Sequence, residues 1–573
     1  MSCQKGEKQQ SVPVLLVLLA LIACNIATPL YAQRMLPTLP DAIYYNAKII
    51  TVDEASNISE AVAVRDGRFL AVGTNSEVRG LAGPQTQMID LHGNTVVPGL
   101  MDNHNHQFHV ILLTLRGIDL QGVGSLAEML ERLQQAAAEA APGETLFTRA
   151  GSWDFTDSPE QRPPSRQDLD AVSRDHPIVV FESRARQYVN SAALDRLGFT
   201  RDTKTHRRIR LGKDNDGELN GEINGRGAAA LHMLLEKVVP PPNLDEQKAL
   251  IKEMHFRQHA MGLTGIRELQ LFPDIMRAYY ELWREDGLTM RVSMGLELNA
   301  GEEGGLEAMI APWGVGSGFG DEWLRIDGIA EFNLGDLLRE PATSTGSTGT
   351  PRTSVESYKQ AILMMNRYGW RPSIHVKGDR TLDIVLDAFE AANQERSIQD
   401  RRWIIEHAIL IHPEQIARIK RLGVMMSAQF QPYNDLKTIL RDWGPERAGK
   451  VLRMRDLLDA GIIVSGGSDW PSAPNNPFLN MYFYVTRHTV DMETVALDQK
   501  ISRMEALKVM TLNNAYLTYE EDIKGSIEPG KLADFVVLSD DILTVPEEQI
   551  KDIVPLATYV GGQNVYSRPD ASF

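Results

Sequence analysis

The amino-acid sequence predicts an α/β protein built on a closed parallel barrel, with β-rich segments at both ends of the chain. Between about residues 100 and 500, short apolar β-rich runs alternate with helical patterns. Such alternation predicts a parallel sheet covered by helices, and the number of units favours a closed barrel over an open sheet. The segments that flank this region at both ends of the chain are typical of short strands.

Short strands are predicted from about residue 40 onward. The segments Ala42–Ile50, Ala61–Val64 and Arg68–Val72 alternate in polarity or are rich in β-branched residues, and an Asp-Gly pair between the last two is a hairpin-turn signal. The segment Ala533–Leu538 repeats this character near the C-terminus. Strands from both ends of the chain therefore flank the predicted barrel.

The middle of the chain supplies the barrel units. The runs that we assign to strands are Ile178–Phe181, Gly265–Glu268, Met290–Leu296, Ser373–Val376, Trp403–Glu406, Val424–Ala428 and Ile462–Gly466. The helical patterns are Leu126–Ala141, Leu244–Met261, Ser357–Tyr368, Thr381–Asn393, Pro413–Leu422 and Met454–Ala460. The segment 152–220 is rich in Arg, Asp and Pro and interrupts the alternation. We predict that it is an insertion, or lid, over the barrel mouth.

Composition excludes several classes of function. The chain has 573 residues, of which 43% are apolar, and this fraction is enough for a sizeable core. The formal net charge of −17 argues against nucleic acid as a partner, because binding phosphates requires a basic face. The only cysteines are Cys3 and Cys24, which excludes a disulfide framework and a cysteine-based zinc site.

The first residues carry the features of an export signal. Lysines precede the apolar run Val12–Cys24, which is too short for a membrane-spanning helix of about 20 residues. Cleavage after Ala32 would remove a signal peptide over residues 1–32. Alternatively, Leu21-Ile-Ala-Cys24 resembles a bacterial lipobox, in which Cys24 is lipidated and attaches the protein to the membrane. Either interpretation predicts an exported protein, periplasmic or secreted, whereas a buried apolar helix is the remaining alternative.

Histidines at the ends of predicted strands indicate a metal site. His104 and His106 follow a predicted strand, and residues two apart on a strand point to the same side, so both imidazoles can reach one ion. His375, His407 and Asp469 each end a further predicted strand. The carboxyl ends of barrel strands meet at one mouth, where the active sites of barrel enzymes lie. Together the five residues form the ligand set of a carboxylate-assisted hydrolytic metal site.

These motifs resemble those of the amidohydrolase superfamily, specifically its amidohydrolase-3 (YtcJ-like) branch of metal-dependent hydrolases. The resemblance extends from about residue 40 to residue 567. It rests on Val97-Pro-Gly-Leu-Met-Asp-Asn-His-Asn-His106, His375-Val-Lys-Gly-Asp-Arg380, Glu406-His407-Ala408, Ser468-Asp469-Trp-Pro471 and Gly525-Ser-Ile-Glu-Pro-Gly-Lys-Leu-Ala-Asp534. It implies a distorted (β/α)8 TIM barrel over residues 99–504. It also implies a small β-sandwich domain formed from both termini, 33–98 and 505–573, the second part beginning with a final helix.

The resemblance also implies a role for each candidate ligand. His104 and His106 would bind a first metal together with Asp469, while His375 and His407 would bind a second one. Asp469 would take a proton from the attacking water and later give it to the leaving nitrogen. The expected cofactor is a divalent metal, with zinc as the first candidate and one or two ions per chain.

One stretch departs from the pattern of this family. Many relatives carry a lysine on the fourth barrel strand, carbamylated so that it bridges two metals. Here the stretch is Gly328-Ile-Ala-Glu-Phe332, in which Ala330 stands at the position of the lysine and Glu331 follows. Glu331 is a candidate ligand, although neighbours on an ideal strand point to opposite faces. An outer polar contact of Glu331 is the alternative.

The lid and the last strand end supply candidate substrate contacts. Arg184 or Arg186 could clamp a substrate carboxylate through a bidentate contact, and a solvated basic turn is the alternative. Trp153, Tyr188 and Trp470 are candidates for apolar walls of the pocket, although aromatic residues also serve simply as core.

The sequence thus predicts an exported metal-dependent hydrolase that acts on small molecules. The expected bond is a C–N bond other than a peptide bond, in an amide or a cyclic amide. A deaminase or an ester or lactone hydrolase on the same site is the alternative among enzymes. A non-catalytic binding protein on the same barrel is the alternative from another class. The expected partners are a small-molecule substrate and a second copy of the chain in a homodimer, without nucleic acid.

Overall fold

A computed structural model describes residues 39–573, apart from gaps at 150–152, 154, 156–157, 183–185, 205–208, 226–228, 272, 298–304, 313 and 572. Residues from Pro40 to Phe573 form one compact unit. The predicted export signal, with Cys24 and Ala32, lies outside the described residues. Among the helices that are described, none is long and apolar enough to cross a membrane.

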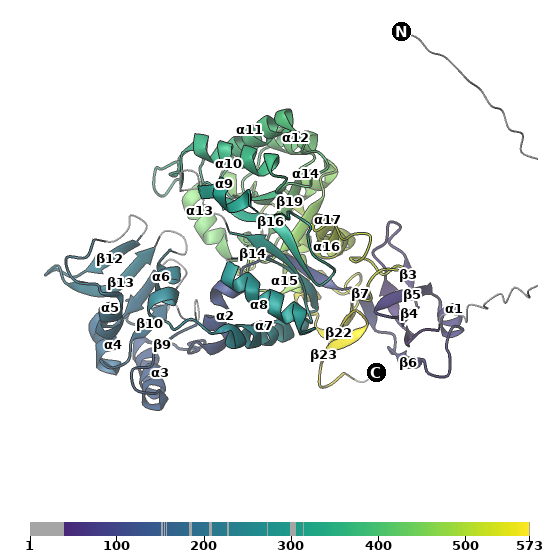
Figure 1. Ribbon diagram of the computed structural model, residues 1–573, viewed down its shortest axis with the longest axis horizontal. Helices are drawn as coiled ribbons and strands as arrows, with labels where there is room; N and C mark the ends of the chain where they lie inside the picture. Colours follow the sequence, from purple (N-terminus) through teal and green to yellow (C-terminus); the bar gives the residue numbers. More distant parts are fainter. Residues whose placement is uncertain are drawn as a thin grey trace, which may run out of the picture. The chain divides into compact units, whose positions relative to one another are not determined.

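An eight-stranded parallel sheet forms the centre of this unit (Figure 1). In spatial order its strands are β8 (Leu100–Asn105), β14 (Leu263–Leu271), β15 (Arg291–Leu296), β16 (Leu324–Asn333), β17 (Pro372–Val376), β18 (Ile404–His407), β19 (Met425–Gln429) and β20 (Val464–Gly467). The first and last strands lie against each other, and the Asp469 N–H donates to the His104 carbonyl at 2.8 Å. The sheet is therefore nearly closed, which confirms the predicted parallel barrel.

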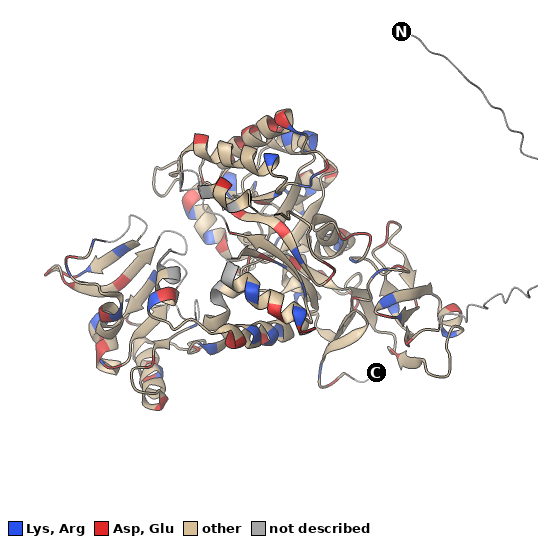
Figure 2. Cartoon of the chain, in the orientation of Figure 1, with Lys and Arg blue, Asp and Glu red and all other residues tan. Residues whose placement is uncertain are grey.

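Helices cover the outside of this barrel (Figure 1). They are α2 (Gln107–Arg116), α7 (Leu244–His259), α8 (Pro273–Arg284), α9 (Gly305–Ile310), α10 (Val355–Arg367), α11 (Asp379–Glu395), α12 (Pro413–Leu422), α13 (Pro432–Ala448), α14 (Met454–Asp459), α15 (Pro477–Thr486), α16 (Arg503–Met510) and α17 (Leu512–Leu517). Acidic and basic residues are intermixed along these helices (Figure 2). Arg367 of α10, for example, pairs with Glu395 of α11 at 2.6 Å.

The chain between α2 and α7 forms a separate layer, which we call the lid. Its sheet has the order β12 (Ile209–Lys213), β13 (Leu219–Gly225), β11 (Arg186–Val189), β10 (Ile178–Phe181) and β9 (Leu146–Phe147). The lid helices are α3 (Leu126–Glu139), α4 (Arg166–Val172), α5 (Ser191–Leu197) and α6 (Ala229–Lys237). The lid therefore has a sheet and helices of its own.

The assignment of Ile178–Phe181 to the barrel is wrong, because this strand is the lid strand β10, antiparallel to β11 and parallel to β9. The physical reason is its burial on both faces. Val179 and Phe181 pack into one lid core, whereas Ile178 and Val180 pack into another. A strand covered on both faces is continuously apolar, as a barrel strand is, so its sequence does not distinguish the two sheets.

Strands from both ends of the chain form two small sheets beside the barrel. One has the order β5 (Arg68–Gly73), β4 (Ala61–Arg65), β1 (Ala42–Tyr45) and β6 (Gln87–Asp90). Helix α1 (Asn75–Arg79) follows β5 in the sequence. The other has the order β23 (Gln563–Ser567), β22 (Pro555–Val560), β21 (Phe535–Leu538), β7 (Thr95–Pro98), β2 (Lys48–Ile50) and β3 (Ile58–Ser59). Strand β7 leads almost directly into β8, so this domain positions the first barrel strand.

Candidate metal centre

Six titratable side chains meet at the carboxyl ends of the barrel strands. They are His104 and His106 at the end of β8, Glu331 of β16, His375 of β17, His407 of β18 and Asp469 just beyond β20. Their exposed fractions lie between 0% and 9%. The five strand-end residues singled out from the sequence and the additional candidate Glu331 are thus all buried in one place.

The first group consists of His104, His106 and Asp469. The Nε2 atoms of the two histidines lie 3.1 Å apart, and Asp469 Oδ1 lies 3.4 Å from the first and 3.2 Å from the second. The close approach of β20 to β8 depends on Gly467, where a Cβ atom would come within 2.4 Å of Asn103 Oδ1. These three residues can offer one ligand atom each to a single ion.

The second group is centred on Glu331. Its Oε1 atom lies 2.5 Å from His375 Nδ1 and 2.9 Å from His407 Nε2. Its Oε2 atom lies 3.8–3.9 Å from Nε2 of the histidine pair on β8. The carboxylate therefore stands between the two pairs of imidazoles, and the alternative of an outer polar contact is not observed. The pairing of β16 with β17 shifts register between Ile329 and Phe332, so the side-chain alternation of an ideal strand does not hold here.

Electrostatics favour ionised carboxylates in this cluster. Burial opposes ionisation, but His375 and His104 hold the pKa of Glu331 well below its usual value. In the same way His104 and His106 hold the pKa of Asp469 well below its usual value. Burial lowers the pKa of His407 to about 4, so this imidazole is neutral near pH 7. Ionised carboxylates and neutral imidazoles are the forms that bind divalent metals.

Burial also acts on His104, but the Glu406 carboxylate, together with Asp469 and Glu331, raises the pKa of this imidazole to about 10. Glu406 was part of a sequence motif, and only the structure gives it a contact, at 2.7 Å from His104 Nδ1. Without a cation His104 thus holds a proton among carboxylates. A divalent ion would take the place of that proton, since metal binding releases protons from its ligands.

Sequence reasoning missed other polar side chains that contact the cluster. Gln431 Nε2 lies 2.6 Å from Asp469 Oδ2 and 3.1 Å from His407 Nδ1. Asp336 Oδ1 lies 3.2 Å from His375 Nε2, so Asp336 and Glu331 flank opposite nitrogens of one ring. Their position in the sequence could have indicated them, because Gln431 and Asp336 both follow the end of a barrel strand within a few residues.

The predicted substrate contacts fall into different places. Trp470 packs against both the barrel core and the lid core, and its carbonyl accepts from the His106 N–H at 3.0 Å. Trp153 and Tyr188 are buried in the hydrophobic core of the lid, where the Tyr188 hydroxyl donates to Glu182 at 2.7 Å. Only Trp470 of the three is thus brought against the candidate ligands.

The predicted carboxylate clamp has carboxylates of its own chain beside it. Arg186 Nη1 lies 3.4 Å from Glu182 and its Nε lies 3.8 Å from Glu222. Arg184 lies outside the described residues. A substrate carboxylate at Arg186 would therefore compete with two glutamates.

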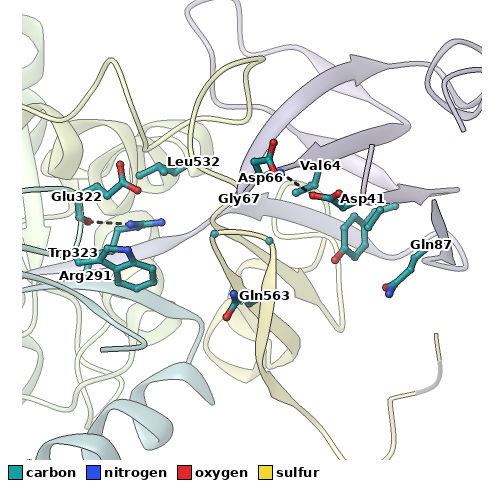
Figure 3. Close-up of a pocket in the computed structure, with 14 residues that line it drawn as sticks. Asp41, Val64, Asp66, Gly67, Gln87, Arg291, Glu322, Trp323, Leu532 and Gln563 are labelled. Atoms are coloured by element: carbon teal, nitrogen blue, oxygen red, sulfur yellow. Dashed lines mark hydrogen bonds between the residues drawn. The ribbon is translucent and has the colours of Figure 1, made fainter. Parts of the chain in front are cut away.

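A hollow of about 510 Å³ lies elsewhere, between the small sheets and the barrel (Figure 3). Its lining includes four charged side chains, and all four are in ion pairs: Asp41 and Asp66 with Arg65, Arg291 with Asp534, and Glu322 with Arg68. None of the six candidate ligands lines it. The hollow is therefore distinct from the metal cluster and offers no unpaired charge to a ligand.

Comparison with known proteins agrees with this geometry. The model of the amidohydrolase family matches residues 87–566. The chain is 27% identical to N-substituted formamide deformylase of Arthrobacter pascens, over 92% of this chain and 98% of that protein. It is 26% identical to protein LONG AFTER FAR-RED 3 of Arabidopsis thaliana, over 92% and 91%.

Solved structures show the same architecture. An uncharacterized metal-dependent hydrolase from Pyrococcus furiosus is 26% identical and superposes with a TM-score of 0.71 over 88% of this chain and 100% of that one. One from Pyrococcus horikoshii has the same fold, with 22% identity and a TM-score of 0.73 over 88% and 99%. With a buried cluster of histidines and carboxylates at the barrel mouth, the chain belongs to amidohydrolase family 3 and is a metal-dependent hydrolase.

Proposed function

We propose that the protein hydrolyses a non-peptide C–N bond in small amides, with N-substituted formamides and cyclic amides as the first candidates. The main observation behind this proposal is a pair of buried triplets, His104–His106–Asp469 and His104–Glu331–His407. Within each triplet the candidate ligand atoms lie within 4.8 Å of one another. The similarity to a formamide deformylase over 98% of its length supports the choice of an amide bond.

The donor set fits a divalent metal. Imidazole nitrogens and carboxylate oxygens are the ligands that zinc takes when cysteine is absent, and the six side chains supply both. We assign His104, His106 and Asp469 to one ion, and His375 and His407 to a second. Glu331 lies between the two pairs, and its distances support a bridging role. This assignment gives a full site of two ions and leaves zinc as the first candidate.

The residues around the ions define the chemistry. A divalent ion at this site supplies an activated water at neutral pH and polarises a carbonyl group. Asp469 is held at one oxygen by Gln431, at 2.6 Å, while its other oxygen faces the imidazoles. The ionised carboxylate can therefore accept a proton from the attacking water and deliver it to the leaving nitrogen. Trp470 borders the site and packs against both the barrel core and the lid core.

Metal analysis and a substrate screen test this proposal. We expect one or two ions per chain, turnover of N-substituted formamides or lactams, loss of turnover with a chelator and recovery with zinc. His104→Ala should abolish both metal binding and turnover, whereas His92→Ala, at an exposed position, should change neither. Turnover of aminopurines or lactones alone would favour the deaminase or lactonase alternative. Metal binding without turnover of any class would favour a binding protein.

We also propose that the protein is exported, on the basis of the basic N-terminus and the 13-residue apolar run that ends at Cys24. Mass spectrometry of the mature N-terminus separates the two processing routes. Cleavage after Ala32 yields a free N-terminus at Gln33, whereas lipidation yields a modified Cys24 in the membrane fraction. Cys24→Ser would release the protein from the membrane only in the second case. An unprocessed chain retained in the cytoplasm would contradict both.

A further inference from the structure

Four charged side chains form a buried network inside the barrel, next to the metal cluster. Arg267 of β14 and Glu406 of β18 are 1% and 0% exposed, and Asp327 of β16 and Arg371, just before β17, are both 3% exposed. Arg267 lies 2.7 Å from both carboxylates, through Nε to Asp327 and through Nη1 to Glu406. Arg371 pairs with the other oxygen of Asp327. Two positive and two negative charges are thus enclosed together.

Glu406 connects this network to His104. Its Oε2 atom lies 2.7 Å from His104 Nδ1, and both residues are fully buried. An ionised carboxylate accepts a hydrogen bond, so the ring proton belongs on Nδ1. The opposite nitrogen, Nε2, then faces His106 and Asp469, at 3.1 and 3.4 Å, and it is the nitrogen whose electron pair a metal would use. This tautomer is the one that a metal at the first triplet requires.

The second oxygen of Glu406 is held as firmly as the first. Oε1 accepts from Arg267 at 2.7 Å and from the Ser373 hydroxyl. Arg267 also donates to the carbonyl of Asn103, the residue before His104, at 3.0 Å. The network therefore fixes both the Glu406 carboxylate, which contacts the His104 ring, and the backbone next to His104.

Stability alone is a weak reason for such a network. Removing charged groups from water is expensive, and apolar side chains of similar volume in place of a buried ion pair often leave stability equal or higher. Orientation of a metal ligand is a role that apolar side chains cannot fill. Carboxylates that accept from the second nitrogen of a metal-bound histidine typically contribute 10–100-fold to metal affinity.

We propose that Glu406 is a positioning residue of the metal centre, which holds the His104 ring and its Nδ1-protonated tautomer, and that Arg267 holds Glu406 in turn. Asp327 and Arg371 complete the charge balance around Arg267. This inference rests on the proposed metal site, but it is independent of which amide the protein hydrolyses.

Two variants and one control test it. Glu406→Gln keeps the size of the side chain but removes the charge that Arg267 and His104 share. Ser373→Ala removes one hydrogen bond to Glu406 and no charge, so it also serves if Glu406→Gln does not fold. The control, Asp534→Asn, breaks the equally buried pair with Arg291, whose contacts of 2.6 and 2.8 Å involve none of the candidate ligands.

Zinc affinity, measured by competition with a chelator, and the visible spectrum of the cobalt-substituted protein are the readouts, beside urea unfolding of the metal-free form. We expect Glu406→Gln to weaken zinc binding 10–100-fold and to shift the cobalt spectrum. Ser373→Ala should act in the same direction by a smaller factor. Asp534→Asn should lower stability while zinc affinity stays within twofold of the wild type.

Unchanged zinc affinity and an unchanged cobalt spectrum in Ser373→Ala and in folded Glu406→Gln would overturn the proposal and leave the network a purely structural one. A wild-type protein that binds no divalent metal would overturn the proposed function as well. The two failures are therefore distinguishable in the same experiment.

Discussion

Glu331 provides the sharpest test of the metal centre, because its carboxylate stands between the two pairs of imidazoles. Glu331→Gln preserves the volume and one oxygen of the side chain but removes its negative charge. In the structure this charge lies 2.5 Å from His375, 2.9 Å from His407 and 3.8–3.9 Å from the histidine pair on β8. Loss of this charge would therefore weaken the binding of an ion at either pair of histidines.

The distances set the magnitude of the effect. A unit charge about 4 Å from a divalent ion, at an effective dielectric constant of about 20, interacts with it by about 8 kcal/mol. Hydration and the remaining amide oxygen offset much of this gross value. A net loss of about 3 kcal/mol, which is about two orders of magnitude in affinity, is the smallest outcome consistent with a direct ligand. We expect the bound metal to fall from two ions towards one, because the triplet with Asp469 remains intact.

The assay combines metal content after dialysis, zinc affinity by chelator competition, and kcat/KM on the best amide substrate. Glu322→Gln is the matched control, since this glutamate lines the separate hollow and pairs with Arg68 at 3.0 Å. Metal content, affinity and turnover of Glu331→Gln equal to those of the control would refute the ligand role of Glu331. The histidines and Asp469 would then remain as a single-ion site.

Three further outcomes follow from particular positions. Gly467→Ala should lower stability by about 1–3 kcal/mol and weaken zinc binding, because a Cβ atom would lie 2.7 Å from the His104 backbone nitrogen. The control is Gly124→Ala, where the atom nearest to an added Cβ is 3.9 Å away, and it should be neutral in the same unfolding and binding assays. Burial, with His259 nearby, lowers the pKa of His255 to about 3. In the unfolded chain this histidine has a pKa of about 6.5, so below that pH the unfolded state binds more protons than the folded state does. The free energy of unfolding therefore decreases by about 2 kcal/mol as the pH falls from 7 to 5. His255→Phe should lose this part of the pH dependence in urea unfolding, and an unaltered pH dependence would contradict the assignment. Arg186→Ala should raise KM for acidic amides more than for neutral ones if the guanidinium binds a substrate carboxylate, whereas equal losses would trace to its pairs with Glu182 and Glu222.

The barrel and the meeting of distant histidines could be predicted because both follow from local rules. Alternating strand and helix patterns specify a parallel sheet, and parallel strands bring their carboxyl ends together whatever the loops do. His104, His375 and His407 each stand at such an end, so their convergence did not depend on any particular register. The lid strand Ile178–Phe181 was misassigned because burial on both faces removes the alternation that would have identified it.

The contacts that orient the ligands could not be predicted, because they depend on register between strands far apart in the chain. Glu406 and Arg267 lie on β18 and β14, which are not neighbours in the sheet, and they meet only across the barrel interior. The direction in which the Glu331 side chain points depends on a register shift that cannot be predicted from the residue types in β16. Such features arise from three-dimensional packing and have no short-range sequence pattern.

The link between β7 and β21 has a consequence for how the protein matures. Val97 of β7 pairs with Val536 of β21, and Asn514 donates to the carbonyl of Met101 at 2.7 Å, across 413 residues. Strand β8, which carries His104, therefore gains this flanking support only after nearly the whole polypeptide has been synthesised. Contacts of this separation form late, because a long loop must close before they repay its entropy. Nascent chains on the ribosome would consequently remain inactive. Shortening the polypeptide at β21 would disable the proposed metal centre although every candidate ligand is still present.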